Sequence, residues 1–215
     1  FDEIFTNLLL MSTNRQKINK IKKNQKVFDD SISKKIIENF KFNLTNDQLR
    51  VIAEIKKDLS SRKKMFRILQ GDVGSGKTIC AFISISNSIE AGYQCALMAP
   101  TEILAKQHYI SANKVFKNTN IKIAFLSGKT LPKDRKVIIN NLKNGHIDLI
   151  IGTHTLFQKK ILFKKLGLAI IDEQHKFGVR QRKELSDKGG NNCDVLVMSA
   201  TPIPRTMIMT IYGDM

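Results

Sequence analysis

The stretch that decides the fold is Gly71-Asp72-Val73-Gly74-Ser75-Gly76-Lys77-Thr78, which fits the pattern G-x-x-x-x-G-K-[ST] at every fixed position. The apolar run Phe66–Gln70 before it predicts a buried strand, and the amphipathic run Lys77–Glu90 after it predicts a helix. A strand, a glycine-rich turn and a helix in this order are typical of an α/β protein with a parallel sheet.

The composition of this turn is that of a phosphate-binding loop. Glycines allow backbone N–H groups to turn inward around an anion without a Cβ clash, and the following helix points its positive end at the same place. The Lys77 ammonium can reach the β- and γ-phosphates of a nucleotide, and the Thr78 hydroxyl can ligate Mg²⁺. A chance match is the alternative, and the flanking strand and helix argue against it. The expected nucleotide-binding residues of the loop are Gly71, Asp72, Val73, Gly74, Ser75, Gly76, Lys77 and Thr78.

Apolar runs and amphipathic stretches alternate through the rest of the chain. Runs such as 148–151 and 168–171 lack polar alternation, as do strands that are buried on both faces of a parallel sheet. The predicted fold is therefore α/β, a three-layer lobe with a mostly parallel central sheet. The expected strands are Phe66–Gln70, Gln94–Met98, Lys122–Leu126, Ile147–Gly152, Leu166–Asp172 and Asp194–Ser199. The expected helices are Lys77–Glu90, Glu102–Phe116, Pro132–Lys143, Val179–Asp187 and Pro204–Tyr212.

Two adjacent carboxylates, Asp172 and Glu173, end one of these buried strands. Ligands of open α/β sheets bind beyond the carboxyl ends of the strands. Asp172 is placed to hold Mg²⁺, partly through water, and Glu173 to orient or deprotonate an attacking water. Such a pair alone could lie in a solvated loop. Together with the phosphate loop it favours a nucleotide-hydrolysing site, whose catalytic residues would be Lys77, Asp172 and Glu173.

Residues 1 to 40 have a different pattern. Apolar residues recur at helical spacing from Ile4 to Met11 and again from Ile32 to Phe40, with a basic run, Lys17–Lys26, between them. We expect one or two helices joined by a basic segment. That segment is either a connecting arm near DNA or a solvated helix face beside a domain boundary.

Composition narrows the class of protein. Hydrophobic residues make up 42% and charged residues 26%, which indicates a globular rather than a disordered chain, and the apolar runs are too short to span a bilayer. A formal charge of +17 favours a nucleic-acid partner, although a genome rich in A and T would also raise the lysine content. The start at Phe1 shows no secretory signal and suggests a longer parent protein.

Neither the cysteines nor the histidines have the spacing of a metal site. We interpret Cys80, Cys95 and Cys193 as buried reduced thiols of a cytoplasmic protein. We interpret His108 and His146 as incidental, that is, as residues without a functional role. A separate possibility is that His154 is a packing residue.

Several short blocks resemble the superfamily 2 helicases, in the order of that superfamily's motifs. They are Phe42–Gln48, Ala99–Leu104, Gly152–His154, Asp172–His175 and Ser199–Pro202. Longer strings narrow the resemblance to the RecG family of bacterial DNA helicases, over about residues 40–215: Gly71–Thr78, Asp172–Val179 and Thr201–Thr206. The transcription-repair coupling factors share parts of these strings but usually carry Glu where this chain has Gln174, so Gln174 favours the RecG family.

The resemblance implies roles for further residues. Gln48 would hydrogen-bond adenine, with Phe42 packed near the base, although Gln48 could instead be a surface helix residue. Thr101, Thr153 and Arg205 would lie on the DNA side, although Thr101 could simply be a helix N-cap. His175 would couple the nucleotide site to Ser199 and Thr201.

The resemblance also implies a domain organisation and an activity. Residues 1–40 would link an upstream wedge-type domain to a RecA-like ATP-binding lobe at 41–215, and a second motor lobe would complete the enzyme. With ATP and Mg²⁺ as cofactors, a bacterial cytoplasmic enzyme would couple ATP hydrolysis to translocation on duplex DNA. It would remodel stalled forks and Holliday junctions through sequence-independent backbone contacts and would have no membrane partner. The 215 residues alone should hydrolyse ATP poorly, because arginine fingers on the second lobe contribute about 10³–10⁵ in rate.

Three alternatives remain open. The chain could belong to a transcription-repair coupling translocase, whose main partner is RNA polymerase. It could be a phosphate-loop ATPase that never acts on nucleic acid, although the blocks at 99–101 and 199–201 argue against this. It could also be a folded binding module without catalysis.

Overall fold

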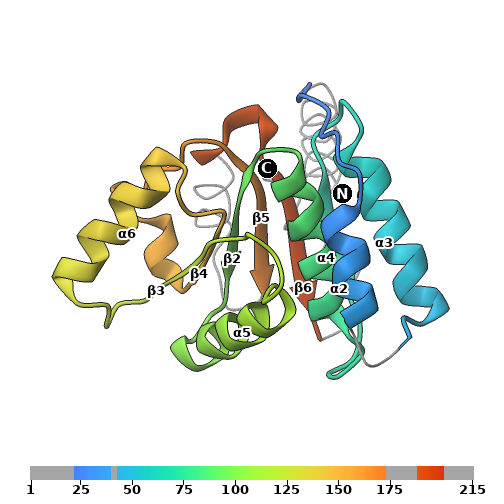
Figure 1. The fold of residues 1–215 in the computed structure, drawn as a ribbon, viewed down its shortest axis with the longest axis horizontal. Helices are drawn as coiled ribbons and strands as arrows, with labels where there is room; N and C mark the ends of the chain where they lie inside the picture. The colour runs from blue at the N-terminus through green and yellow to red at the C-terminus, as the bar shows by residue number, and fades with distance from the viewer. Residues whose placement is uncertain (1–21, 40–42, 173–187, 201–215) are drawn as a thin grey trace, which may run out of the picture.

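A computed structural model describes residues 22–39, 43–172 and 188–200 of the 215-residue chain. Its centre is a six-stranded sheet in the order β1-β6-β5-β2-β4-β3, and the five strand pairings are all parallel (Figure 1). The strands are β1 (Phe66–Gln70), β2 (Gln94–Met98), β3 (Ile123–Leu126), β4 (Leu149–Gly152), β5 (Leu166–Asp172) and β6 (Asp194–Ser199). The predicted α/β class with a parallel sheet is confirmed.

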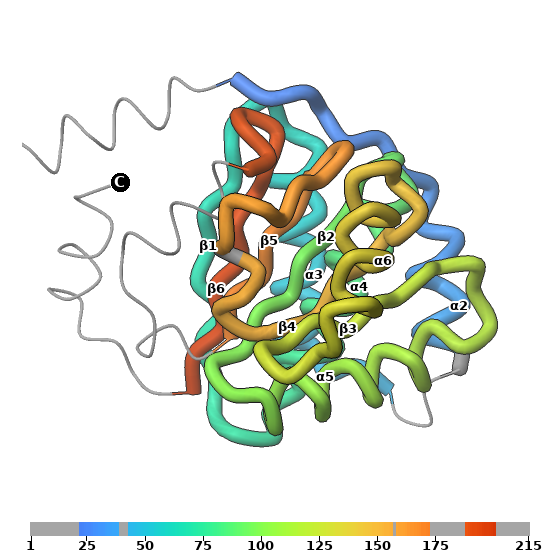
Figure 2. Tube along the Cα trace, turned by 90° about the vertical axis from the view of Figure 1, so that its left-hand side faces the viewer, coloured from blue at the N-terminus to red at the C-terminus, as the bar shows by residue number. Residues whose placement is uncertain are grey.

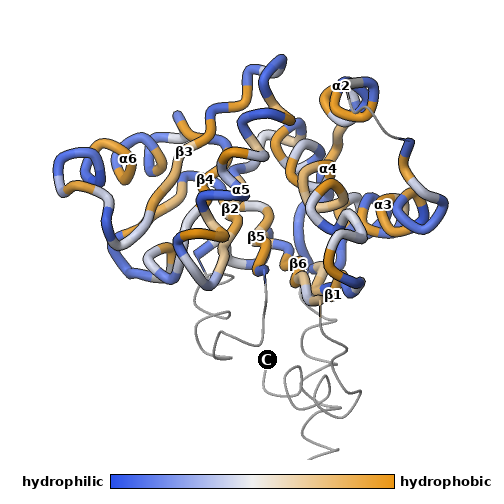
Figure 3. Tube along the Cα trace, turned by 90° about the horizontal axis from the view of Figure 1, so that it is seen from below, coloured by the Kyte–Doolittle hydropathy of each residue, from blue (hydrophilic) through white to orange (hydrophobic). Residues whose placement is uncertain are grey.

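Helices cover both faces of the sheet and make three layers. They are α2 (Ser31–Asn39), α3 (Asn46–Leu59), α4 (Lys77–Glu90), α5 (Glu102–Val115) and α6 (Pro132–Asn144), with short 3₁₀ turns at His154–Phe157 and Gly190–Asn192. Seen from below, the strand ends form a row with α2, α3 and α4 on one side and α6 on the other (Figure 3). Helix α5 lies across the lower end of the sheet, towards which the strand arrows point (Figure 1).

Alternate residues of each central strand enter two different cores. Leu168 and Ile170 of β5 belong to the core under α3 and α4, whereas Ala169 and Ile171 belong to the core under α6. All seven residues of β5 are buried, which explains why its sequence lacks polar alternation. Among the described residues, every helix is too short or too polar to cross a bilayer.

The expected strands are all present, with small differences at their starts. Strand β3 begins one residue later than expected and β4 two residues later. Just before both strands, the Asp148 carboxylate accepts a hydrogen bond from the Lys122 backbone N–H at 2.8 Å. Helix α5 ends one residue earlier than expected, and α6 ends one residue later, where Gly145 adopts a left-handed φ of 80°. The expected helices at 179–187 and 204–212 lie outside the described residues.

Helix α3 is an element that the sequence analysis did not predict. It begins with a capping box, in which the Thr45 hydroxyl accepts from the Gln48 backbone N–H and the Gln48 side chain accepts from the Thr45 backbone N–H. Its inner face buries Ile52, Ile55 and Leu59. The T-x-x-Q spacing before this apolar periodicity is a local signal that could have revealed the helix.

The described part of the N-terminal segment packs against the lobe. Helix α2 confirms the expected second amphipathic pattern, and its Ile36 is buried in the core that α4 also lines. Residues 22–30 form an extended segment that runs over the end of the molecule opposite α5 (Figure 2). The interpretation of the basic run as a solvated helix face is wrong for Lys23 and Lys26, because their side chains have no exposed surface. The interpretation as a connecting arm stays a prediction.

Candidate active site

The phosphate loop joins β1 to α4 and has the backbone shape that its glycines predict. Gly74 and Gly76 have φ values of 83° and 82°, in the left-handed region that favours glycine. Gly76 is the N-cap of α4 and offers no capping side chain, and the first turn of the helix contains no acidic residue. The first N–H groups of α4 and the positive end of its dipole are therefore available to an anion.

The two functional side chains that follow the loop lie at its mouth. The Lys77 Nζ donates to the carbonyl oxygens of Gly71 and Asp72, the second at 2.7 Å. Lys77 and Thr78 are both half-buried, whereas residues 72–75 are exposed. The loop thus presents an ammonium, a hydroxyl and backbone N–H groups on an open surface, which is the donor set that a polyphosphate requires.

Gln48 lies directly against this loop. Its Nε2 donates to the carbonyl oxygen of Ser75 at 2.9 Å, and a Cβ added to Gly76 would lie only 2.2 Å from the same atom. The side chain is therefore held between the start of α3 and the loop, and it is not a free residue on the helix surface. Its predicted contact with adenine stays a prediction.

Asp172 and Ser199 lie at the same edge of the sheet as the loop. Strand β6 lies between β1 and β5, and the Gly71 N–H donates to the Ser199 carbonyl oxygen at 3.3 Å. Asp172 ends β5 in register with Met198, one residue before Ser199. Since neighbouring strands are about 4.8 Å apart, Asp172 is roughly 10 Å across the sheet from the strand that carries the loop.

Asp172 also points to the side of the sheet where the loop's helix lies. Along β5, Leu168 and Ile170 enter the core that includes α4, and Asp172 continues this alternation. Its carboxylate thus faces the α4 and α5 side of the sheet. The geometry that the nucleotide-hydrolysis hypothesis requires, a carboxylate on the loop's side of the sheet and at its carboxyl end, is present.

His108 contacts Asp172, so the interpretation of this histidine as incidental is wrong. The His108 Nε2 lies 2.6 Å from the Asp172 Oδ2, and the two side chains are only 11% and 12% exposed. His108 is on α5, 64 positions before Asp172. No pattern in the local sequence marks it, because the contact is made by the packing of α5 across the carboxyl end of the sheet.

The residues expected on the DNA side differ in exposure. Thr101 is exposed and caps α5, since its Oγ1 accepts from the Leu104 backbone N–H at 3.3 Å, so the N-cap interpretation is confirmed. Thr153 follows β4 at the same edge but is only 4% exposed. A DNA contact is therefore more accessible to Thr101. His154 is exposed, which contradicts its interpretation as a packing residue, and His146 is exposed as well.

Part of the predicted site lies outside the described residues. These are the base-packing Phe42, the carboxylate Glu173, the neighbouring Gln174, the coupling residues His175 and Thr201, and the DNA-side Arg205. Their roles stay predictions.

The oxygen atoms near the loop suit Mg²⁺. The Thr78 hydroxyl and the Asp172 carboxylate are hard oxygen ligands, and Mg²⁺ is usually held by one or two such groups together with phosphates and water. Within residues 22–39, 43–172 and 188–200, no cluster of three or more His, Cys, Asp or Glu side chains could form a metal cage.

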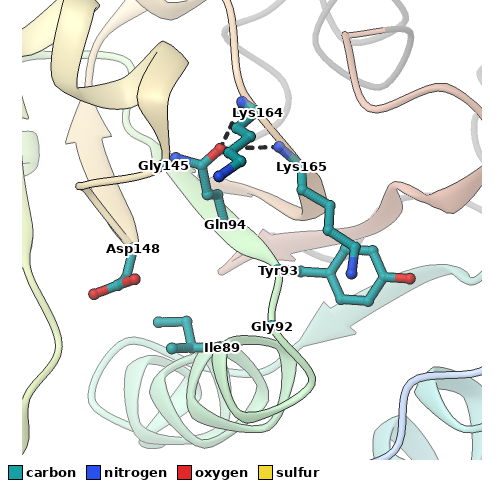
Figure 4. Close-up of a pocket in the computed structure, with 8 residues that line it drawn as sticks. All are labelled: Ile89, Gly92, Tyr93, Gln94, Gly145, Asp148, Lys164 and Lys165. Carbon is teal, nitrogen blue, oxygen red and sulfur yellow. Dashed lines mark hydrogen bonds between the residues drawn. The ribbon is translucent and has the colours of Figure 1, made fainter.

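A cavity of about 330 Å³ lies at the opposite, amino-terminal end of the strands (Figure 4). It is crossed by the Gln94 side chain, whose Oε1 accepts from the backbone N–H groups of Lys164 and Lys165. The Gln94 Nε2 donates to the carbonyl oxygens of Leu142 and Ile147. Since the four bonds join the start of β2 to α6 and to the residues just before β4 and β5, we interpret Gln94 as a structural residue and place no site here.

Comparison with known proteins finds similarity to DNA helicases. The ATP-dependent DNA helicase RecG of Aquifex aeolicus is 47% identical over 216 residues, covering 100% of this chain and 27% of that protein. RecG of Thermotoga maritima is 46% identical over 215 residues with the same two shares. A solved structure of RecG bound to a three-way DNA junction superimposes with a TM-score of 0.84 at 45% identity, covering 99% of this chain and 28% of that chain.

This chain therefore spans less than a third of the length of these relatives. The model of the DEAD/DEAH box helicase family matches residues 45–210, which include the phosphate loop, Asp172 and Ser199. On this match, which extends over most of the chain, the protein belongs to the DEAD/DEAH box helicase family.

Proposed function

We propose that this chain is the first motor lobe of an ATP-dependent DNA helicase of the RecG type, which remodels branched DNA. The observation that carries the proposal is the convergence of the phosphate loop, Gln48, Ser199 and Asp172 at one edge of the sheet. The similarity to RecG over the whole chain supports the choice of enzyme, and the junction-bound relative supports the choice of DNA substrate.

The nucleotide would bind with its phosphates in the loop. Backbone N–H groups of residues 74–78 and the Lys77 ammonium would hold the β- and γ-phosphates, and Gln48 would hydrogen-bond the adenine beside Phe42. Thr78 and Asp172 would hold Mg²⁺, partly through water. When bound, Mg²⁺ would neutralise charge on the phosphate oxygens. Glu173 would orient the attacking water or accept its proton.

DNA would bind at the same edge of the sheet. Thr101 caps α5 on an exposed surface, and Thr153 and Arg205 would contribute further contacts on the DNA side. Contacts to the sugar-phosphate backbone do not read the bases, so binding should be independent of sequence and should weaken steeply with salt. The formal charge of +17 favours such a polyanionic partner.

A backbone hydrogen bond between the phosphate loop and β6 would help to couple nucleotide binding to DNA binding. The carbonyl oxygen of Ser199 accepts a hydrogen bond from the N–H of Gly71, so the end of β6 is joined to the start of the loop. A shift of the loop on ATP binding would therefore displace Ser199. His175 and Thr201 would complete this route to the DNA side.

We also propose the domain organisation that the relatives' greater length suggests. Residues 1–40 would connect an upstream wedge-type domain to the lobe formed by 41–215, and a second motor lobe would follow. Closure of the two lobes on ATP would supply arginine fingers and the other half of the DNA groove. In bacteria such an enzyme would act in the cytoplasm.

The similarity to RecG favours branched DNA over the alternative activities. Transcription-repair coupling predicts RNA polymerase as the main partner, and Gln174 argues against that family. The blocks at 99–101 and 199–201 argue against an ATPase that does not act on nucleic acid.

The test is ATP hydrolysis by the intact protein without DNA, with linear duplex and with a three-way junction, at low and raised salt. We expect the junction to stimulate hydrolysis most, and salt to reduce the stimulation. Lys77→Ala should lower the rate by about 10²–10³, because a charge that stabilises the transition state is lost. Lys143→Ala is the matched control, since Lys143 is an exposed lysine at the end of α6. A rate of hydrolysis that is the same without DNA, with linear duplex and with the junction would refute the proposal.

A further inference from the structure

His108 is a buried, polar residue that the proposed mechanism does not use. Its Nε2 lies 2.6 Å from the Oδ2 of Asp172, at a position where both side chains are almost fully covered. A contact this short needs a proton between the two atoms, and in the tautomer that carries its hydrogen on Nε2, His108 donates and the Asp172 carboxylate accepts. Hydrogen bonds to an ionised acceptor are about twice as strong as neutral ones.

The position of His108 on α5 is fixed by its neighbours on the helix. Ala105, His108 and Ala112 are the buried residues of α5, and their spacing of three and four places them on one face. The two alanines have small side chains, which allow the helix to approach the sheet closely. The imidazole is therefore brought to the end of β5 by the packing of a whole helix and not by a loop.

We propose that His108 is a positioning residue for Mg²⁺, which orients the Asp172 carboxylate towards the ion. The hydrogen bond engages Oδ2 and thereby restricts rotation of the carboxylate, so that Oδ1 keeps a constant direction. A carboxylate that approaches a metal is usually held in this way by a hydrogen-bonding partner, and loss of the partner typically lowers metal affinity by about 10- to 100-fold.

The same helix also begins at the residue that we expect to contact DNA. Thr101 caps α5, and His108 follows seven residues later, roughly two turns along the same helix. A displacement of α5 when Thr101 engages DNA would move His108 with it. His108 would then change the orientation of Asp172. DNA binding at Thr101 would in this way affect the carboxylate that holds Mg²⁺.

This inference rests on the proposed function, since it assumes that Asp172 faces Mg²⁺ and nucleotide. The two can be tested apart, because the wild-type protein tests nucleotide binding and the variants test the role of His108. The variants are His108→Gln, His108→Asn and His108→Ala. The Gln amide nitrogen can take the place of Nε2, whereas the Asn side chain is one methylene shorter and its amide nitrogen corresponds to Nδ1.

The measurement is calorimetric binding of a non-hydrolysable ATP analogue to the intact protein, with Mg²⁺ and without it. In the wild type we expect Mg²⁺ to tighten binding. His108→Ala and His108→Asn should reduce this Mg²⁺-dependent gain in affinity for the analogue by about 10-fold or more. The affinity without Mg²⁺ should not change. His108→Gln should restore most of the gain, which a purely structural role would not predict. His146→Ala, at an exposed histidine of the opposite edge, should behave as the wild type.

A second readout is the Mg²⁺ concentration that half-activates ATP hydrolysis, which should rise in His108→Ala and His108→Asn but not in His108→Gln. An unchanged Mg²⁺-dependent gain in His108→Ala would overturn the role of His108 and leave the proposed function intact. An equal loss in His108→Gln and His108→Asn would also overturn it, since the donor at Nε2 would then be irrelevant. A wild-type protein that binds no nucleotide would overturn both proposals.

Discussion

The Nζ of Lys26 lies 2.6 Å from the Oδ2 of Asp194, and neither side chain has any exposed surface. The Nζ of Lys23 approaches the same oxygen at 2.5 Å, and the backbone N–H of Met65 donates to Oδ1 at 2.6 Å. Burial lowers the pKa of Lys23, and the Asp194 carboxylate opposes this effect only in part. One carboxylate at the start of β6 thus fastens the extended N-terminal segment to the lobe.

Removal of this carboxylate should destabilise the protein strongly. Asp194→Ala leaves two buried ammonium groups and a buried N–H without their shared acceptor, and loss of one partner from a buried pair costs about 3–5 kcal/mol. Thermal unfolding should show a clear fall in melting temperature, and amide exchange at Met65 should become faster. Asp47→Asn is the matched control, since its carboxylate is 84% exposed beside Arg50. Equal melting of the two variants would contradict the importance of the cluster.

Gly152 should not tolerate a methyl group. A Cβ at this residue would lie 2.1 Å from the Leu126 carbonyl oxygen and 3.3 Å from the Leu156 side chain, so β3 and β4 would have to separate. We expect Gly152→Ala to lower the free energy of unfolding by about 1–3 kcal/mol. Gly128→Ala provides the comparison, because a Cβ there meets no heavy atom within 4 Å and should be neutral or slightly stabilising. Urea denaturation measures the free energy of unfolding of both variants. Equal values for Gly152→Ala and Gly128→Ala would contradict the prediction.

Substitution of Gln48 should affect the choice of nucleotide more than the stability of α3. Gln48→Ala removes the predicted bond to adenine and the observed bond to Ser75, so ATP affinity should fall by about tenfold and approach that for other nucleoside triphosphates. Thr45→Ala removes the helix cap without touching the base, so it should lower stability and keep selectivity. Affinities for ATP, GTP and CTP would separate the two effects. The same loss of selectivity in both variants would mean that Gln48 acts only through the helix.

The three cysteines should be unreactive in the folded protein. Burial raises the pKa of Cys80 to about 11 and that of Cys193 to about 12, and it raises the pKa of Cys95 as well. The nucleophile is the thiolate, and a raised pKa keeps the thiol protonated until the pH exceeds it. At pH 8 a disulfide reagent should therefore modify none of them until urea is added, as peptide mass spectrometry can show. Rapid labelling of the native protein would disprove the burial of these thiols.

The agreement between sequence and structure is closest where the pattern is local. The loop at 71–78 and the strands around it depend on glycines, apolar runs and helix-forming residues that are neighbours in the chain, so their elements were expected with errors of at most two residues. Helix α3 was missed although Thr45 and Gln48 carry its capping signal. The residues expected from resemblance, such as Gln48 and Ser199, do lie at the loop, because α3 places Gln48 against Ser75 and because β6, which ends at Ser199, pairs with β1.

By itself, the sequence determined the α/β class, the phosphate loop and the carboxylate at the end of β5, since each follows from a repeating pattern or from adjacent residues. Only the tertiary structure decided that His108 contacts Asp172 and that Lys23 and Lys26 converge on Asp194. The partners are 64, 171 and 168 positions apart in the sequence, and a local sequence pattern cannot predict contacts between residues so far apart. Their contacts exist because helix α5 and the N-terminal segment pack on opposite ends of one sheet, which is a property of the assembled fold.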